Sequence, residues 1–459
     1  MAPRITVIGG GSNQWAPGLL TDIANTRSLR EAEIVLEDIN PDPLPRMVEY
    51  AEHVARLRGL AWKISSTTDQ RASLEGADFV VVAISTGGFD SMRHDVEIPA
   101  RHGIKLSVGD QGPAGVSRTL RSVPVMVGIA RDMEEICPDA WMLNVTNPMT
   151  QLVRAMTRET SAKVVGLCHE VTICRFYLSM WLGESFLDLE PTVVGVNHLP
   201  IMTGLKVRGV DDGFDRLRAL LDGPAEARAE RLPFPIPDGI GMGPSKRKSD
   251  EWTKEDLLDG NRVKIELFQR FGALPASNDR HLCEFFPGLL REESGWGERW
   301  GVHLTTISER IAHEEQYKAE VEARLASNEV SAMPSGEMVA PLIDSIIRDK
   351  RRTFPFNLPN TGQAIGIPND VVVETMCVTD GDGVRGGEPA AAPGVLGEYV
   401  RRMTSVDELS VEAALSGKRD DVIAAMLADP LSSSIDYDDM VRMTDELLAA
   451  TKPWLPQFA

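Results

Sequence analysis

A short apolar strand that runs into consecutive glycines is the feature that most constrains how this chain folds. The strand covers residues 5–8, and the residues that follow it are Gly9, Gly10, Gly11 and Ser12. A helix is predicted to open soon afterwards, at about Pro17. Glycines let the backbone approach a pyrophosphate, and the N-terminus of a helix favours negative charge. The pattern predicts a dinucleotide site in a fold of alternating strands and helices.

An acidic residue after the second apolar run indicates which dinucleotide binds. Residues 34–36 lead to Asp38, whose carboxylate can accept hydrogen bonds from an adenosine ribose. A carboxylate at this position suits NAD, because it would repel the additional phosphate of NADP. Glycines after a strand more often form a simple turn. The usual dinucleotide-binding motif, G-x-G-x-x-G, ends in a glycine, and this chain has Gln14 at that position. The combined spacing of strand, glycines, helix and acid nevertheless favours an NAD site.

The first two hundred residues alternate apolar strands with amphipathic helices, which is the rhythm of a doubly wound parallel sheet. The expected strands cover residues 5–8, 34–36, 79–84, 141–145, 164–167 and 192–196. Helical stretches predominate beyond residue 200, and a further strand pair is expected near residues 364–367 and 371–378. The sequence predicts an α/β protein with a Rossmann-like domain over residues 1–200 and a second α+β, mostly helical domain over residues 201–459.

Ligands of such a sheet collect at the carboxyl ends of its strands, so the residues after each strand are candidate contacts. Two of these places contain small or amide side chains, namely Ser85, Thr86 and Gly87 after one strand and Asn144 and Asn147 after another. We expect Ser85–Gly87 and Asn144 to contact the cofactor, although the first group is also typical of a turn. Asn147 precedes Pro148 and is either the N-cap of a helix or a hydrogen-bonding partner of a ribose or sugar hydroxyl.

Two further strand ends contain side chains that can ligate a metal ion. Cys168 follows the strand at residues 164–167, and His198 follows the strand at residues 192–196. One thiolate and one imidazole are too few for a closed zinc site, but they leave positions open for water and substrate oxygens. The pair predicts a catalytic divalent metal beside the NAD site.

Composition excludes several classes of partner. The chain has 459 residues with 48 Lys and Arg against 68 Asp and Glu, a formal net charge of -20. Such a charge disfavours nucleic acid and acidic membrane surfaces. No apolar run approaches the roughly 20 residues of a membrane span, and no charged-then-apolar leader opens the sequence. The five cysteines are scattered without paired spacing, which favours a reducing cytoplasm.

The chain resembles glycoside hydrolase family four, the NAD- and metal-dependent glycosidases. The matching segments, in chain order, are residues 9–12, 17–18, 38, 112–115, 144–148, 166–169, 195–198, 270–272, 281–285, 357–360 and 367–374. The sequence Cys-His-Glu-Val at residues 168–171 is similar to the class of this family that is associated with α-linked substrates. The absence of a Cys-Asp or Cys-Asn form at that place argues against 6-phosphosugar substrates.

The resemblance implies an unusual reaction, since the family is an exception to hydrolysis by two carboxylates. NAD would take a hydride from sugar C3, a base would remove the C2 proton, the C1 leaving group would depart, water would add, and the hydride would return. The metal, Mn²⁺ by family preference, would be held by Cys168 and His198. His169 and Asp110 are the candidates for the acid, and Asp256 and Asp259 are candidates for the C2 base. The C-terminal domain would bind substrate and form a homodimer or homotetramer.

The type of sugar is suggested by basic residues. Lys246, Arg247 and Lys248 form either a solvated basic turn or a clamp for a carboxylate or sulfonate at sugar C6. We expect Arg280, Asn147, His169 and Asn197 to contact the sugar as well. The favoured substrate is an α-glycoside of an anionic hexose, either a hexuronide or a sulfoquinovoside. The alternatives are a neutral α-glucosidase or α-galactosidase of the same family, or an NAD dehydrogenase of the malate or lactate type.

Overall fold

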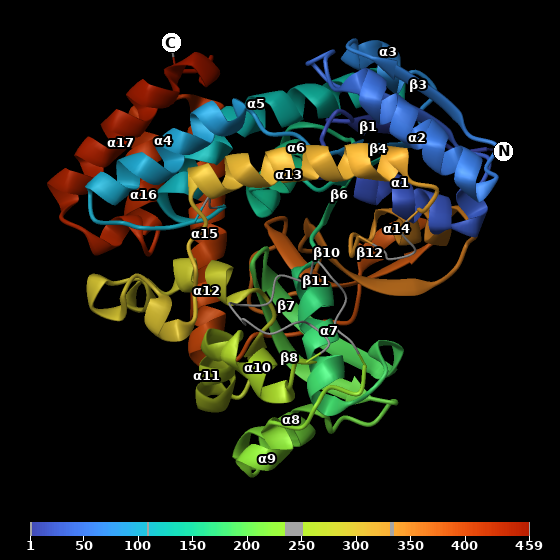
Figure 1. Ribbon diagram of the computed structural model, residues 1–459. Helices are drawn as coiled ribbons and strands as arrows, with labels where there is room; N and C mark the ends of the chain where they lie inside the picture. Colours follow the sequence, from blue (N-terminus) through green and yellow to red (C-terminus); the bar gives the residue numbers. More distant parts are fainter. Residues whose placement is uncertain (1, 108–109, 235–250, 331–334, 459) are drawn as a thin grey trace.

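The computed structural model describes residues 2–107, 110–234, 251–330 and 335–458. Its centre is one mixed sheet in which the described strands follow the order β3-β2-β1-β4-β5-β6-β10-β11-β7-β8-β9, with β12 paired to β11 (Figure 1). The first six strands in that order are β3 (Lys63–Thr67), β2 (Glu33–Glu37), β1 (Arg4–Ile8), β4 (Phe79–Val82), β5 (Trp141–Asn144) and β6 (Lys163–Leu167). All their pairings are parallel. This order is that of a Rossmann fold, which confirms the predicted fold class.

The edge strand β3 is absent from the sequence prediction. Its residues, Lys-Ile-Ser-Ser-Thr, contain one apolar side chain, and none of the five is buried. A strand at the edge of a sheet contributes little to the core, so its sequence lacks the apolar run that identifies an inner strand. Residues 63–67 form a strand because they pair with β2, and local sequence patterns do not predict such pairing.

An antiparallel half extends the sheet beyond β6. Its strands are β10 (Arg352–Pro359), β11 (Val372–Asp380), β7 (Leu189–Val196), β8 (Leu199–Val207), β9 (Leu274–Pro275) and β12 (Gly383–Gly386). The prediction of a strand at residues 364–367 was wrong, because the partner of β11 is β10. Two prolines, Pro355 and Pro359, concealed β10, since proline usually argues against an inner strand.

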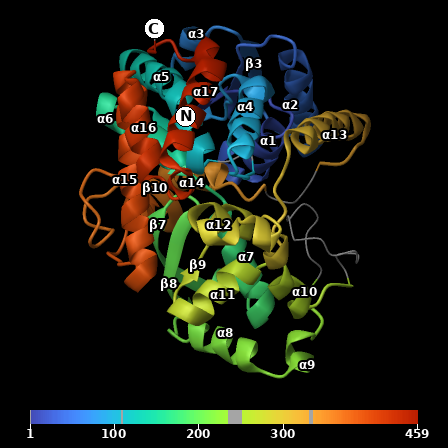
Figure 2. The ribbon, with the colours of Figure 1, turned by 90° about the vertical axis from the view of Figure 1, so that its left-hand side faces the viewer.

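Helices cover both faces of the parallel half. One face packs against α1 (Ala16–Asn25), α2 (Leu44–Arg58) and α14 (Val339–Ile347). The other packs against α4 (Gly88–Arg101), α5 (Gly112–Ile136), α6 (Met149–Glu159), α15 (Gly394–Ser416), α16 (Arg419–Ala428) and α17 (Tyr437–Thr451). The short α3 (Gln70–Leu74) lies near the β3 edge (Figure 2). The last three long helices therefore pack back onto the parallel half of the sheet, although they follow the antiparallel half in the sequence.

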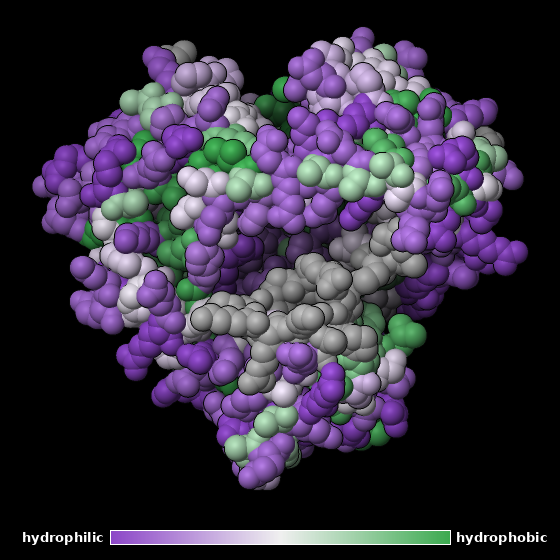
Figure 3. Space-filling model, in the orientation of Figure 1, coloured by the Kyte–Doolittle hydropathy of each residue, from purple (hydrophilic) through white to green (hydrophobic). Residues whose placement is uncertain are grey.

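A second group of helices surrounds β7 and β8 in the lower part of Figure 1. Its members are α7 (Glu170–Leu182), α8 (Gly213–Asp222), α9 (Ala225–Arg228), α10 (Lys254–Asp259) and α11 (Arg262–Phe271). A separate apolar core, which includes Tyr177, Trp181 and Phe268, stabilises this part. Two more helices, α12 (Asp279–Phe285) and α13 (Ile307–Ala326), lead back to the upper half. Figure 3 shows a hollow in the molecular surface just below α13, between the two halves.

The sheet passes through the predicted domain boundary, because residue 200 lies inside β8. The division into residues 1–200 and 201–459 remains a prediction. Among the described residues, no helix is both long enough and apolar enough to cross a bilayer.

Candidate active site

The glycine loop after β1 adopts a conformation that requires glycine. Gly9 has φ 86°, and the backbone N–H groups of Gly9 and Gly10 donate to the carbonyl oxygen of Glu37 at 2.9 and 2.7 Å. A Cβ atom on Gly9 would lie 2.1 Å from the carbonyl oxygen of Ala83. The loop is thus pressed between the ends of β2 and β4, with its backbone at the carboxyl edge of the sheet. A diphosphate needs such a side-chain-free stretch of backbone.

Asp38 lies against this loop, at the end of β2. Its Oδ2 accepts a hydrogen bond from the Gly11 N–H at 3.1 Å, and its Oδ1 accepts from the Asn40 N–H at 3.0 Å. Ser12 stabilises the next turn, since its hydroxyl oxygen accepts from the Trp15 N–H at 3.1 Å. The structure therefore brings the predicted acid and the predicted glycine loop together, as an adenosine ribose site requires.

The other predicted cofactor contacts surround the same edge. Gly87 has φ 77° and ends the loop after β4, in which the Thr86 hydroxyl oxygen is buried without a hydrogen-bond partner. Asn144 is fully buried, and its side chain bonds the Thr146 carbonyl and N–H at 2.9 and 3.0 Å. Asn144 thus shapes the turn after β5, and a direct contact with the cofactor remains a prediction.

Asn147 does not cap a helix. Helix α6 begins at Met149, and its N-cap residue is Pro148. Because that proline precedes the first helical turn, Asn147 lies one residue too early to accept from the helix N–H groups. Its side-chain oxygen is buried and has no hydrogen-bond partner among the described residues, so it is available to a ligand.

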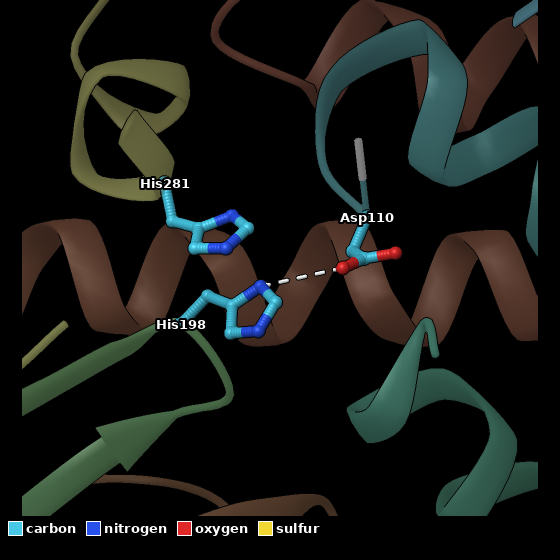
Figure 4. Close-up of side chains that lie close together, drawn as sticks. All are labelled: Asp110, His198 and His281. Carbon is cyan, nitrogen blue, oxygen red and sulfur yellow. Dashed lines mark ion pairs between the residues drawn. The ribbon is translucent and has the colours of Figure 1, made fainter. Parts of the chain in front are cut away.

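Three buried side chains converge where the two halves of the sheet meet. Asp110, His198 and His281 each offer a ligand atom, and these atoms all lie within 4.8 Å of one another (Figure 4). Asp110 precedes α5, His198 lies at the turn between β7 and β8, and His281 belongs to α12. His198 Nδ1 lies 3.6 Å from Asp110 Oδ2, and the two imidazoles stack with centroids 4.0 Å apart. His198 holds this place with a left-handed φ of 64°.

The donors of this cluster fit a divalent metal ion. The Nδ1 atoms of His198 and His281 are both buried, and neither has a hydrogen-bond partner in the described part of the chain. Burial lowers the pKa of both imidazoles, so that they are neutral and can offer a lone pair to a metal. Arg280 Nη2 lies 3.2 Å from His281 Nε2. Since a guanidinium can only donate, an ion at His281 Nδ1 would require the tautomer protonated at Nε2 and release of that contact.

Cys168 is buried and is not a member of this cluster of three residues. Burial raises the pKa of its thiol well above the usual value, and the carboxylates of Glu374 and Glu170 add to the effect. Among the described residues, no group of three metal-binding side chains includes Cys168. A bound ion would reverse this, because coordination deprotonates a thiol. The pairing of Cys168 with His198 remains a prediction, and His281 is a candidate ligand that we did not predict.

His169 is held as a cation by a carboxylate from a distant segment. Its Nδ1 lies 2.5 Å from Glu337 Oε1. Burial alone would lower the pKa of His169, but the charge of Glu337 and this hydrogen bond raise it to about 9. Glu337 was not predicted, since nothing in its local sequence indicates that it pairs with a strand-end histidine.

Glu170 anchors the start of α7 beneath the two histidines. Its Oε2 accepts from the Asn278 N–H at 2.5 Å and from the Ser277 hydroxyl at 3.1 Å. Burial would raise the pKa of Glu170, yet the charge of His169 and the hydrogen bonds from Asn278 lower it. Glu170 therefore remains ionised and adds negative charge to the cluster.

Two more buried carboxyl groups lie close to the site. Asn197 Nδ2 donates to Glu374 Oε2 at 3.2 Å, and burial raises the pKa of Glu374 to about 8. Glu284 accepts from the Ser107 N–H at 3.1 Å, and burial together with the charge of Asp110 raises its pKa to about 8. Both acids can hold a proton at neutral pH. Glu284 lies in the segment that resembles the family, but no local pattern indicated this property.

Arginines supply positive charge beside the carboxylates. Arg118 forms an ion pair with Asp110, and its Nη2 also donates to the Asn147 carbonyl at 3.3 Å. Arg280 donates to the Thr305 hydroxyl at 3.2 Å. Arg310, on α13, has a buried Nε that no described residue bonds, and burial and the charge of Arg280 lower its pKa. The predicted clamp of Lys246, Arg247 and Lys248 lies outside the described residues.

The structure gives the two predicted bases local roles. Asp256 forms a capping box with Thr253 at the start of α10, where its Oδ2 accepts from the Thr253 N–H at 2.8 Å. Asp259 has a side chain that is 60% exposed, and it pairs with Arg262 at 3.3 Å. None of these contacts joins Asp256 or Asp259 to the histidine cluster, and their assignment as bases remains a prediction.

A Rossmann-type nucleotide site and a buried metal-type cluster thus share one edge of the sheet, and comparison with known proteins identifies the family. The model of the family 4 glycosyl hydrolases matches residues 4–184, and the model of their C-terminal domain matches residues 193–432. An α-galactosidase of Bacillus subtilis is 30% identical and aligns over 99% of both chains. An α-galacturonidase of Thermoanaerobacterium saccharolyticum is 31% identical over 98% of this chain and 96% of its own. The chain belongs to the family 4 glycosyl hydrolases.

Solved structures agree with this assignment. A putative glucosidase of Bacillus subtilis, lplD, has a TM-score of 0.83 at 28% identity and covers 97% of this chain and 100% of its own. The 6-phospho-beta glucosidase of Thermotoga maritima, solved with manganese, NAD+ and glucose-6-phosphate, has a TM-score of 0.77 at 19% identity, with 98% and 99% coverage. The family, the fold class and the glycoside hydrolase activity predicted from the sequence are confirmed.

Proposed function

We propose that this enzyme hydrolyses α-glycosides of an anionic hexose and requires NAD and a divalent metal ion, with Mn²⁺ as the first candidate. One observation carries the proposal. The buried cluster of Asp110, His198 and His281 lies beside three arginines and at the same sheet edge as the glycine loop. In this proposal, a cofactor, an ion and a charged sugar occupy adjoining sites.

The cofactor assignment rests on the backbone around Gly9 and on Asp38. A loop that excludes any Cβ and an acid that is bonded to the Gly11 N–H together suit NAD. The Thermotoga maritima relative was solved with NAD+ and manganese, which supports both assignments. When bound, NAD supplies reversible hydride transfer at a sugar carbon, and the ion supplies Lewis-acid polarisation of the sugar oxygens.

His169 is the proposed proton donor to the leaving group. The pKa of about 9 means that its imidazole carries a proton at neutral pH, and Glu337 fixes the orientation of the ring. Asp110 is paired with Arg118, so it suits the role of a fixed carboxylate that orients the cluster better than that of a proton donor. The C2 base stays assigned to Asp256 or Asp259 as a prediction.

The anionic sugar is supported by the arginines and by the relatives. Arg280 and Arg310 present buried or half-buried guanidinium groups beside the histidine cluster, and Arg310 Nε has no acceptor among the described residues. A carboxylate or sulfonate at sugar C6 would supply that acceptor. The 31% identity with an α-galacturonidase makes a hexuronide the first candidate, with a sulfoquinovoside as the second. The similar identity with an α-galactosidase keeps a neutral sugar as the alternative.

A panel of nitrophenyl glycosides tests this proposal. The purified enzyme is assayed with α- and β-galacturonide, glucuronide, sulfoquinovoside, galactoside and glucoside, each with and without NAD and Mn²⁺. We expect nitrophenol release from an α-linked anionic sugar only when both NAD and the ion are present. Faster release from neutral galactoside or glucoside would overturn the anionic assignment while leaving the cofactor assignment intact.

We also propose that the enzyme works in the cytoplasm as a homodimer or homotetramer. All five cysteines are buried and unpaired, which suits a reducing compartment. Light scattering during size-exclusion chromatography measures the assembly, and a monomeric mass would contradict that part of the proposal.

A further inference from the structure

A fully buried ion pair lies directly beneath the loop after β4. It joins Arg121 on α5 to Asp95 on α4, and each side chain is 1% exposed. Arg121 Nη1 donates to Asp95 Oδ1 at 2.9 Å and Nη2 bonds to Oδ2, so the contact has the two-pronged form that a guanidinium makes with a carboxylate. Neither residue belongs to the histidine cluster.

The remaining donor of Arg121 points to the backbone of that loop. Its Nε donates to the Thr86 carbonyl oxygen at 3.1 Å, and the Ser91 hydroxyl donates to the same oxygen at 2.9 Å. Arg121 Nη1 also lies 3.3 Å from the Ser117 hydroxyl. The orientation of the Thr86 peptide is therefore fixed by two donors, and one of them is clamped in turn by Asp95.

Close packing surrounds the next residue of the loop. Gly87 has φ 77°, and a Cβ atom there would lie 2.7 Å from Ser91 Cβ and 2.9 Å from Trp454 Cε2. Trp454 belongs to a short helical turn near the C-terminus, Lys452–Trp454. The loop is thus confined between α4 and this helical turn near the end of the chain.

We propose that Arg121 is a positioning residue that sets the affinity of the enzyme for NAD. The hydrogen bond from Arg121 to the Thr86 carbonyl fixes the orientation of residues 85–87. In that orientation, these residues can contact a cofactor bound along the glycine loop. This inference rests on the proposed binding of NAD at Gly9. A buried ion pair contributes little net stability compared with apolar packing, so a role in conformational specificity accounts for its place better than a role in stability.

Two substitutions test the inference without leaving a charge unpaired. Arg121→Lys keeps a cation beside Asp95 but lacks the planar fork that reaches both Asp95 and Thr86. Ser91→Ala removes the second donor to the Thr86 carbonyl and changes no charge. The matched control is Arg154→Lys, because Arg154 donates to Glu408 at 2.6 and 3.1 Å between α6 and α15, away from this loop.

The measurement is the Kd for NAD by isothermal titration calorimetry, together with the unfolding temperature of each protein. We expect Arg121→Lys to raise the Kd about tenfold, as the loss of one hydrogen bond implies. Ser91→Ala should raise the Kd about threefold, because the Thr86 carbonyl keeps its bond from Arg121. Arg154→Lys should leave the Kd unchanged. A wild-type Kd in the Arg121→Lys protein would overturn the inference. If that protein does not fold, a wild-type Kd in Ser91→Ala overturns it.

The controls separate this inference from the function on which it rests. Absence of NAD binding by the wild-type enzyme would overturn the proposed function and the inference together. NAD binding by wild type with equal Kd values in the variants would overturn the inference alone. An equal rise of Kd in Arg154→Lys would identify general destabilisation and would also overturn it.

Discussion

The imidazole rings of His198 and His281 stack on each other, with centroids 4.0 Å apart and planes inclined by 23°. One ring comes from the turn between β7 and β8, and the other comes from α12. Each has a buried Nδ1 with no hydrogen-bond partner within the described ranges, and Asp110 offers a ligand atom within 4.8 Å of one on each ring. Two neutral histidines and a carboxylate in this arrangement form a site that an ion completes.

Substitution of His281 tests which side chains bind the metal. If the ion is bound by the cluster of Asp110, His198 and His281, His281→Ala should weaken Mn²⁺ binding at least about tenfold, because one of three donors is lost. Cys168→Ser tests the thiolate predicted from the sequence. Both variants are measured by titration of Mn²⁺ followed by electron paramagnetic resonance.

His303→Ala is the control for these variants. The His303 side chain is 72% exposed and pairs with Glu309 on the surface, so its loss should leave Mn²⁺ affinity unchanged. Weak binding in Cys168→Ser with normal binding in His281→Ala would assign the ion to Cys168 and His198 instead. Normal binding in both variants would contradict both ligand sets.

Alanine in place of Gly9 should strongly weaken NAD binding. The added Cβ would lie 2.1 Å from the Ala83 carbonyl oxygen and would occupy a φ of 86° that alanine disfavours. We expect the Kd for NAD to rise by more than roughly tenfold, since the loop must move. Gly59→Ala is the control, because Gly59 has φ 60° with no atom within 4 Å of a Cβ. It should lose about 1 kcal/mol of stability and keep its affinity for NAD.

Local patterns in the sequence were sufficient to predict the glycine loop, Asp38 and the inner parallel strands, because apolar runs and glycines act within a few residues. Local patterns were not sufficient to predict that His281, Glu284 and Glu337 belong to the site. These residues reach the site by packing of distant helices and loops, and nothing near them in the sequence indicates a partner. Asp256 shows a different limit, because its carboxylate bonds to the nearby Thr253 in a capping box. Helix-start acids have this local use so often that their sequence position does not identify a base.

Glu37→Gln should remove part of the dependence of stability on pH. Burial, aided by the charges of Asp38 and Asp69, raises the pKa of Glu37 from 4.5 to about 7. The folded state therefore binds more protons than the unfolded state between these values, and the free energy of unfolding falls as the pH rises through this window. The loss is about 3 kcal/mol at most by pH 8.

Urea denaturation at several pH values between 5 and 8 measures this effect. Because glutamine does not ionise, the variant should lose less stability than the wild type as the pH rises across this range. The Glu37 carbonyl that accepts from Gly9 and Gly10 is unchanged by the substitution. An identical pH dependence in both proteins would contradict the assignment to Glu37.

Arg310→Gln should weaken binding of an anionic sugar selectively. The buried Arg310 Nε has no acceptor in the described protein, and a C6 carboxylate or sulfonate is the acceptor that we propose. We expect KM for the anionic glycoside to rise about tenfold, since a charged hydrogen bond is lost, while NAD affinity stays constant. Arg442→Gln is the control, because Arg442 is 62% exposed and pairs with Asp439. An unchanged KM would exclude Arg310 from sugar recognition.

The most direct test of the account is the balance between glycoside cleaved and NADH formed. The wild-type enzyme, freed of nucleotide and metal, receives Mn²⁺ and NAD at a small fraction of the glycoside concentration, and both nitrophenol and absorbance at the NADH wavelength are followed. We predict many turnovers of glycoside per NAD with no accumulation of NADH, and no turnover when either addition is omitted. Accumulation of NADH in proportion to the substrate consumed, or undiminished hydrolysis without NAD and metal, would contradict the account.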